Sequence, residues 1–316
     1  MTLDYANGMT TANSSLNSCI ALRHILLLVA FTFSGLLHAQ TQFHSFTVQV
    51  HGTGKPVIFI PGLACPGSIW DTTVAQISAT YECHVITIAG FGGSPASSAN
   101  PILPNVRDEL IAYIRETKLD RPTLVGHSLG GFLALWIAEI APQSVGKIVV
   151  VDALPFLAVA QDPKESPESM RLPAEQIRAQ IASENSAEFL QAQKTILATF
   201  VTDPAQAEAL AAVTSKSDQK VVAEAYYELL TTDLRPGLPS IRCPAVLLSA
   251  PATYAKYAPI EAIDNNFRSQ YAALPQAEFV SFKTARHFLM FDEPQRWFEV
   301  LKKALATSSS SVLSHK

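Results

Sequence analysis

One short segment, residues 123–136, constrains the fold of this chain more than any other. It reads T-L-V-G-H-S-L-G-G-F-L-A-L-W, so an apolar run precedes the pattern G-x-S-x-G and a helical pattern follows it. A serine displayed at such a sharp strand-to-helix turn needs strained backbone, and a Cβ atom two residues before or after it would clash. This steric requirement explains why glycine stands two residues before Ser128, at Gly126, and two residues after it, at Gly130. We therefore expect Ser128 to stand exposed at the edge of a sheet as a nucleophile, with His127 beside it in the turn.

The rest of the chain supplies a sheet around this turn. Short apolar runs alternate with helical patterns, which predicts a parallel sheet with crossover helices on both faces. The predicted strands are 43–50, 56–60, 84–89, 122–125, 147–151, 244–250 and 278–282. The predicted helices between them are 70–80, 106–116, 129–141 and 265–273. The predicted fold class is α/β, a mostly parallel, doubly wound sheet of about eight strands.

Residues 153–239 interrupt this alternation. They contain no strand-like run, and they contain four helix candidates, at 174–183, 187–200, 204–213 and 219–231. An all-helical insertion between two parallel strands predicts a lid over the carboxyl edge of the sheet, where open α/β sheets bind ligands. An extra helical layer with no role in access is the alternative. The insertion divides the core into residues 40–152 and 240–306.

Residues 1–39 have the pattern of a signal peptide. The apolar run 25–37 follows Arg23 and ends near Ala39, so a positive flank, a short apolar region and a small-residue cleavage site occur in order. The flank is long and carries Asp4, which leaves an uncleaved signal anchor or a buried helix as alternatives. We expect export to the periplasm or the exterior, with cleavage near Ala39. Residues 307–316 are expected to form a flexible tail.

Composition excludes several classes of protein. No run of 18 uninterrupted apolar residues occurs, which excludes a polytopic membrane protein. With 48% hydrophobic and 16% charged residues, the chain can bury a large core. The net charge of −4 offers no basic surface for nucleic acid. We therefore expect a small-molecule substrate, with no nucleic-acid partner and no membrane partner beyond the signal segment.

Cysteine spacing indicates neither a metal site nor a dense disulfide framework. Three cysteines remain after residue 39, namely Cys65, Cys83 and Cys243. An odd number allows at most one disulfide among them, and their spacing matches no zinc pattern. Buried small hydrophobic side chains are the favoured interpretation. No metal and no organic cofactor are expected.

His287 is the candidate base for Ser128, because a serine hydroxyl is a poor nucleophile without one. This histidine follows the last predicted strand, and a loop there can reach across the sheet edge to the serine. Asp292 and Gln295 are expected to form a capping box at the start of the next helix. The side chain of His127 is expected to leave the turn in another direction.

Two backbone N–H groups are the expected donors to an oxyanion, which needs preorganised hydrogen bonds. One belongs to Leu129, directly after Ser128. The other belongs to Leu63, on the loop that follows the predicted strand 56–60, where Gly62 allows a sharp turn. The N–H of Ala64 is the alternative second donor.

Four segments together resemble the α/β-hydrolase superfamily, in particular its esterase-like members with a helical cap. They are the Pro61-Gly62 loop and residues 126–131, 151–155 and 287–294, and the resemblance extends over roughly residues 44–305. It implies a serine hydrolase that cleaves carboxylic esters of small to medium hydrophobic acyl or aryl groups through an acyl-enzyme on Ser128. Hydrolysis of lactones or amides, as by an acyl-homoserine lactonase or an aminopeptidase-like enzyme, is the alternative. A ligand-binding protein on the same fold is a further one.

The chain departs from this family at the acid of the catalytic triad. The family acid usually follows the strand that corresponds to 244–250, but residues 249–257 contain no carboxylate. Some members supply the acid from the end of the preceding strand, where Asp152 stands here. The histidine needs an acid to hold its tautomer and to stabilise the imidazolium. Asp152 is the expected acid, and Glu261 and Asp264 are the alternatives.

Overall fold

The computed structural model describes residues 43–160 and 164–306, which contain a doubly wound α/β sheet and thus confirm the predicted fold class. The predicted signal peptide and tail lie outside these residues. The strands are β1 Phe46–His51, β2 Lys55–Ile60, β3 Tyr81–Ile88, β4 Thr123–His127, β5 Lys147–Val151, β6 Ala245–Ser249 and β7 Ala277–Ser281. Each corresponds to one predicted run. The described sheet has seven strands rather than about eight, because these residues hold seven such runs.

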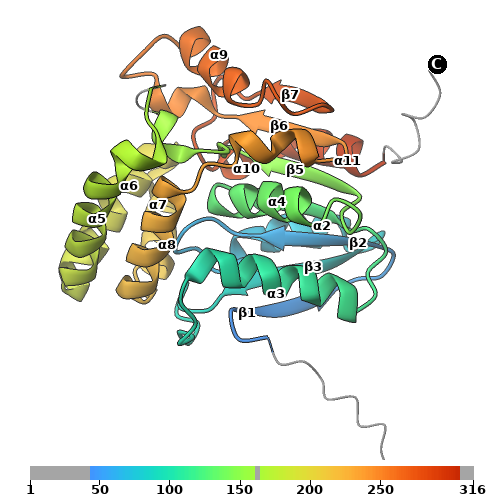
Figure 1. Cartoon of the computed structure of the whole chain (residues 1–316), viewed down its shortest axis with the longest axis horizontal. Coiled ribbons are helices and arrows are strands. Elements are labelled where there is room, and N and C mark those ends of the chain that lie inside the picture. The colour runs from blue at the N-terminus through green and yellow to red at the C-terminus, as the bar shows by residue number, and fades with distance from the viewer. Residues whose placement is uncertain (1–42, 161–163, 307–316) are drawn as a thin grey trace, which may run out of the picture. The chain divides into compact units, whose positions relative to one another are not determined.

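The sheet runs in the order β1-β3-β2-β4-β5-β6-β7, with β1 at one edge and β7 at the other (Figure 1). All neighbouring pairs are parallel except β1 and β3, which pair antiparallel from Phe46 opposite Ile88 to His51 opposite Cys83. Because β2, β4 and β5 are parallel neighbours at the centre of the sheet, the loops that follow them open at the same carboxyl edge.

Alternate residues of the central strands bury on opposite faces, as a sheet covered on both sides requires. On one face, Ile58, Leu124 and Ile148 pack with α3 Ile102–Glu116, α4 Leu129–Ile140 and α9 Ile260–Gln270. On the other face, the neighbouring strand residues pack with α2 Asp71–Ile77 and α11 Pro294–Ala306. The core therefore has two layers, one on each side of the sheet.

The capping box predicted for Asp292 and Gln295 is wrong. Residues Leu289–Asp292 form a short helix of their own, α10, and α11 begins at Pro294. Proline is well suited to the first helical position because its missing N–H would be unpaired there in any case. Asp292 is therefore the last residue of one helix rather than the cap of the next, and its carboxylate is free to bond elsewhere.

The insertion between β5 and β6 is helical, as predicted. Its helices are α5 Pro167–Ser183, α6 Ser186–Phe200, α7 Pro204–Thr214 and α8 Gln219–Thr231. Asn185, Asp203 and Asp218 accept backbone N–H groups at the starts of the last three. Helix α5 packs on α8, and α6 packs on α7. Figure 1 shows the four helices grouped beside one end of the strands, and we call them the cap.

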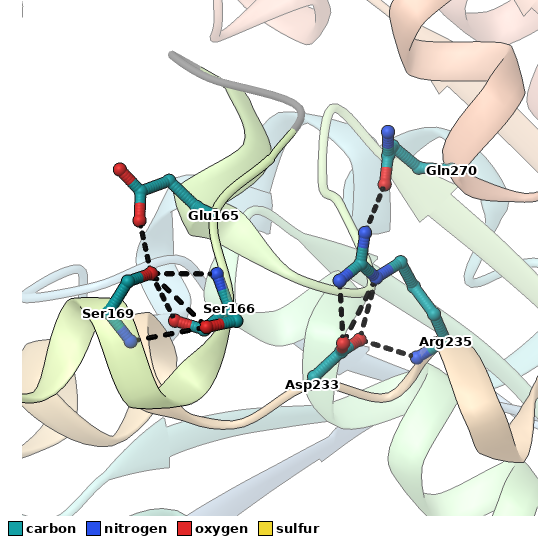
Figure 2. A network of polar contacts seen from close by, with 6 residues as sticks. All are labelled: Glu165, Ser166, Ser169, Asp233, Arg235 and Gln270. Atoms are coloured by element: carbon teal, nitrogen blue, oxygen red, sulfur yellow. Dashed lines mark hydrogen bonds and ion pairs between the residues drawn. The ribbon is translucent and has the colours of Figure 1, made fainter.

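Polar contacts anchor the base of the cap (Figure 2). The guanidinium group of Arg235, in the 3-10 helix Arg235–Ser240 that returns to the core, pairs with Asp233 at 2.7 Å and donates to Gln270 of α9 at 3.2 Å. Where the chain enters the cap, the side chains of Ser166 and Ser169 each accept the other residue's backbone N–H. These two hydrogen bonds close the first turn of α5.

Glu228 of the cap stabilises a helix of the core, and its removal should destabilise the protein. Its two carboxylate oxygens accept the N–H groups of Ile102 and Leu103, at 2.8 and 2.6 Å. These are the first two residues of α3, whose N–H groups have no partner within the helix. Glu228→Ala leaves both without an acceptor at a buried site. We expect the free energy of unfolding, measured by urea denaturation, to fall by about 2–3 kcal/mol.

Glu224 provides the matched control one turn earlier on α8. Its carboxylate pairs with Arg178 at 2.8 Å, and both side chains are partly exposed. Such pairs contribute about 0–1 kcal/mol. If Glu224→Ala and Glu228→Ala lowered the free energy of unfolding equally, this would contradict a capping role for Glu228.

Within residues 43–160 and 164–306, no helix combines the length and the apolar character that a membrane span requires.

Candidate active site

Ser128 lies at a strained turn between β4 and α4. Its backbone angles are φ 52° and ψ −119°, a region that residues with a side chain rarely occupy. A Cβ atom on Gly126 would lie 2.1 Å from the carbonyl oxygen of Gly130, and one on Gly130 would lie 2.2 Å from that of Ile60. Both positions therefore require glycine. The turn presents the serine side chain at the carboxyl edge of the sheet.

Asp152 and His287 form a hydrogen-bonded pair at the same edge. Asp152 Oδ2 lies 2.6 Å from His287 Nδ1, and the other carboxylate oxygen accepts the N–H of Ala250 at 2.8 Å. Asp152 directly follows β5 with a positive φ of 46°, which turns its side chain toward the loop after β7 that carries His287. With one ring nitrogen held by a carboxylate, the imidazole is set to take a proton at Nε2.

The two alternative acids lie elsewhere. Asp264 accepts a hydrogen bond from Ser249 Oγ at 2.5 Å and pairs with Arg268 Nε at 3.1 Å. Burial raises the pKa of Asp264, but the hydrogen bonds from Ser249 and Arg268 outweigh it, so its pKa lies below the ordinary value. Glu261 is exposed and lies 3.8 Å from Lys283. The structure therefore brings Asp152, and neither alternative, to His287.

The buried ring of His127 lies against the loop that carries His287. Its ring centroid is 4.6 Å from that of His287, and its Nε2 lies 3.0 Å from the backbone oxygen of His287. Burial and the neighbouring His287 hold the pKa of His127 well below its usual range. The ring is therefore neutral and donates from Nε2 to that carbonyl. Adjacency to Ser128 was the only sequence signal for this contact.

The described residues show no hydrogen bond between the Ser128 hydroxyl and the ring of His287. Hydrogen bonds between catalytic groups are often long in the absence of substrate and shorten when substrate binds. His127 places the backbone of His287 directly beside the serine turn.

The two predicted oxyanion donors lie on chain segments next to Ser128. A Cβ atom on Gly62 would lie 3.3 Å from the Cβ of Ser128, so the loop after β2 passes directly against the serine. Leu63 follows on this loop, and Leu129 is the first residue of α4. Among the described residues, neither of these two N–H groups donates to a protein acceptor. Both are free to bind an oxyanion.

The loop that carries His287 is held by the end of cap helix α6, a contact that the sequence did not indicate. Asp292 accepts the N–H of Thr202 at 2.9 Å and that of Arg286 at 2.8 Å. The N–H of Phe288 donates to the carbonyl of Phe200 at 3.2 Å. The ring of Phe200 lies 4.6 Å from the ring of His287. The cap is therefore part of the wall around the histidine.

Asp292→Asn should loosen this loop. An amide keeps one acceptor oxygen, but its NH₂ group would face the second backbone N–H. We expect the free energy of unfolding to fall by about 1–2 kcal/mol and kcat for an ester to fall severalfold. Glu293→Gln is the control, because its carboxylate bonds only the side chains of Thr284 and Arg296 among the described residues. An Asp292→Asn enzyme with unchanged kcat would contradict this role.

The described residues include metal-ligating side chains and three cysteines. No group of three or more His, Cys, Asp or Glu side chains there could hold a metal ion. The cysteines of the described residues, Cys65, Cys83 and Cys243, are buried and form no disulfide. Burial raises the pKa of Cys65, on the oxyanion loop, to about 12, so its thiol stays protonated.

A serine on a strand-to-helix turn, with a histidine–aspartate pair at the same sheet edge, is an arrangement typical of α/β hydrolases. The chain belongs to the alpha/beta hydrolase family, whose model matches residues 57–300.

Three individual proteins that resemble this chain have less than 30% sequence identity to it. The chain is 27% identical over 110 residues to a pimeloyl-[acyl-carrier protein] methyl ester esterase from Aliivibrio salmonicida, covering 35% of this chain and 40% of that protein. The chain thus spans less than half the length of this curated relative. An enol-lactonase from Burkholderia xenovorans superposes with a TM-score of 0.69 at 17% identity, over 83% of this chain and 96% of that one. A thermophilic esterase from Thermogutta terrifontis gives 0.66 at 19% identity, over 82% and 92%. Both structures share the fold.

Proposed function

We propose that this protein is a serine esterase that hydrolyses carboxylic esters through an acyl-enzyme on Ser128. The observation that carries the proposal is the Asp152–His287 pair at the sheet edge where the Ser128 turn projects. The relatives support it, since one is named a methyl ester esterase and another an esterase.

In the proposed mechanism each of these residues has a step. Ser128 Oγ attacks the ester carbonyl carbon, and its proton passes to His287 Nε2. The N–H groups of Leu63 and Leu129 hold the oxyanion. The tetrahedral intermediate then collapses, and the alcohol leaves with the proton from His287. Water attacks the acyl-enzyme with His287 again as base, while Asp152 holds the ring and stabilises the imidazolium in both halves of the reaction.

Apolar side chains near the site favour small to medium hydrophobic acyl or aryl esters. The ring of Phe200 lies 4.6 Å from that of His287 in a tilted arrangement, and Leu63 on the oxyanion loop is partly exposed. A lactone is an internal ester and would pass through the same steps, and the fold neighbour named an enol-lactonase makes it the second candidate.

Hydrolysis of p-nitrophenyl esters of increasing acyl length tests the proposal. We expect turnover with a maximum at a short or medium acyl chain, and the length at which kcat/KM falls would measure the acyl pocket. Lactones of matched size would be assayed in parallel. Absence of turnover with every ester and lactone would reject the proposal and favour a ligand-binding role.

We further propose that the chain is exported, on the signal-like pattern of residues 1–39. Mass spectrometry of the protein from its native host should show an N-terminus near Gln40. An intact Met1 would exclude cleavage.

A further inference from the structure

The oxyanion loop, residues 61–67, is fixed by the core at its two ends. It begins directly after β2, and at its far end the N–H of Gly67 donates to Thr87 Oγ1 at 2.9 Å. Between these ends the chain makes a turn in which the N–H of Cys65 donates to the carbonyl of Gly62 at 3.1 Å. The two candidate second donors to the oxyanion, the N–H groups of Leu63 and Ala64, lie inside this turn.

This turn is strained. Ala64 has a φ of 61°, in the left-handed region that residues with a Cβ atom rarely occupy. At the third position of a turn this conformation ordinarily calls for glycine or asparagine. A strained residue keeps its conformation only where its surroundings hold it there. The position of the two N–H donors therefore depends on the hydrogen bonds that the backbone of Ala64 forms with its surroundings.

A serine of the cap bonds this strained residue. Ser217, in the corner between α7 and α8, donates its hydroxyl to the carbonyl of Ala64 at 2.9 Å. The hydroxyl oxygen of Ser217 also accepts the N–H of Gly92, on the loop after β3, at 2.8 Å. Ser217 is 7% exposed and Ala64 only 2%, so the Ala64 carbonyl has little access to bulk water in place of this hydroxyl. The next residue strengthens the junction, since the N–H of Asp218 donates to the carbonyl of Gly90 at 2.7 Å.

We infer that Ser217 is a positioning residue for the oxyanion hole, through which the cap holds the Leu63 and Ala64 N–H groups in register with Ser128. The inference rests on the proposed esterase function. Ser217 touches no reacting atom; it acts by fixing the Ala64 carbonyl and thereby the turn. Without the hydroxyl, the strained turn can relax and carry its N–H donors away from the oxyanion. Because misplacement by about 1 Å can cost a hundredfold in rate, the effect falls on chemistry rather than on substrate binding.

The test compares Ser217→Ala with Ser215→Ala, a matched substitution whose hydroxyl forms no hydrogen bond among the described residues. For Ser217→Ala we expect kcat for a p-nitrophenyl ester to fall about tenfold to a hundredfold, with KM changed less than about threefold. An alkyl trifluoromethyl ketone provides a second readout. Ser128 Oγ adds to its carbonyl carbon, the serine proton passes to His287, and the ketone oxygen becomes an oxyanion in the hole. Its affinity should fall by the same factor as kcat.

Each outcome decides between a positioning and a merely structural role. A lowered melting temperature with unchanged kcat and unchanged ketone affinity would overturn the inference. If Ser217→Ala does not fold, Ser217→Cys keeps a similar shape with weaker and longer hydrogen bonds, and a folded Cys variant with wild-type kcat would overturn it equally. Failure of the wild-type protein to turn over any ester would instead reject the proposed function, so the two failures are distinguishable.

Discussion

Ser128→Ala should abolish ester hydrolysis, lowering kcat by at least about ten-thousandfold. The alanine variant keeps the oxyanion donors and the Asp152–His287 pair but has no hydroxyl to form the acyl-enzyme. In serine hydrolases, loss of the nucleophile removes nearly all the rate that the triad provides, and the remaining enhancement comes from the oxyanion hole and binding. The measurement is steady-state kcat for a p-nitrophenyl ester, together with the burst of p-nitrophenol that an accumulating acyl-enzyme produces.

A folding control accompanies this variant. Ser128 forms its backbone bond to Val151 through its own N–H, at 2.9 Å, and alanine retains that N–H. The thermal midpoint should therefore stay close to that of the wild type. Ester turnover that persists in a folded Ser128→Ala protein would show that another group attacks the carbonyl, and it would remove the basis of the proposed mechanism.

Asp152→Asn should lower kcat by about four orders of magnitude. The asparagine oxygen can still accept the N–H of Ala250, so the loop keeps its position. Its NH₂ group then faces His287 Nδ1 and stabilises the tautomer that carries the proton on Nε2. That tautomer cannot accept the serine proton. The variant thus tests the electronic role of the acid with little change in shape.

Asp264→Asn is the matched control, a buried aspartate whose partners are Ser249 and Arg268. We expect its kcat to stay within about threefold of the wild type, with a modest loss of stability from the weakened pair with Arg268. A larger loss of kcat in Asp264→Asn than in Asp152→Asn would place the acid on α9 and would contradict the present assignment.

His127 and Asp292 make contacts that local reasoning did not predict. His127 was expected only to leave the turn in another direction than Ser128. Its ring lies against the histidine loop and bonds the backbone of His287. Asp292 lies three residues before Gln295, the spacing of a capping box, but the proline at 294 starts the helix later and leaves the carboxylate to join the cap to the histidine loop.

The sequence by itself determined the fold class, the serine turn and the helical insertion. Each depends on residues that are close along the chain: strand and helix periodicities, and the glycines two positions from Ser128 that steric contact within the turn requires. It also placed Asp152, Asp264 and Glu261 on loops near the same edge of the sheet, but it could not decide among them.

Only the tertiary structure shows which of these carboxylates contacts His287. Asp152 and His287 are separated by 135 positions along the chain, and their 2.6 Å contact depends on the neighbouring placement of β5 and β6 and on the path of the loop after β7. The same holds for Ser217 and Ala64, which are 153 positions apart. Hydrogen bonds of this range carry no local pattern, because their geometry arises from how whole elements pack rather than from the spacing of residues within one element.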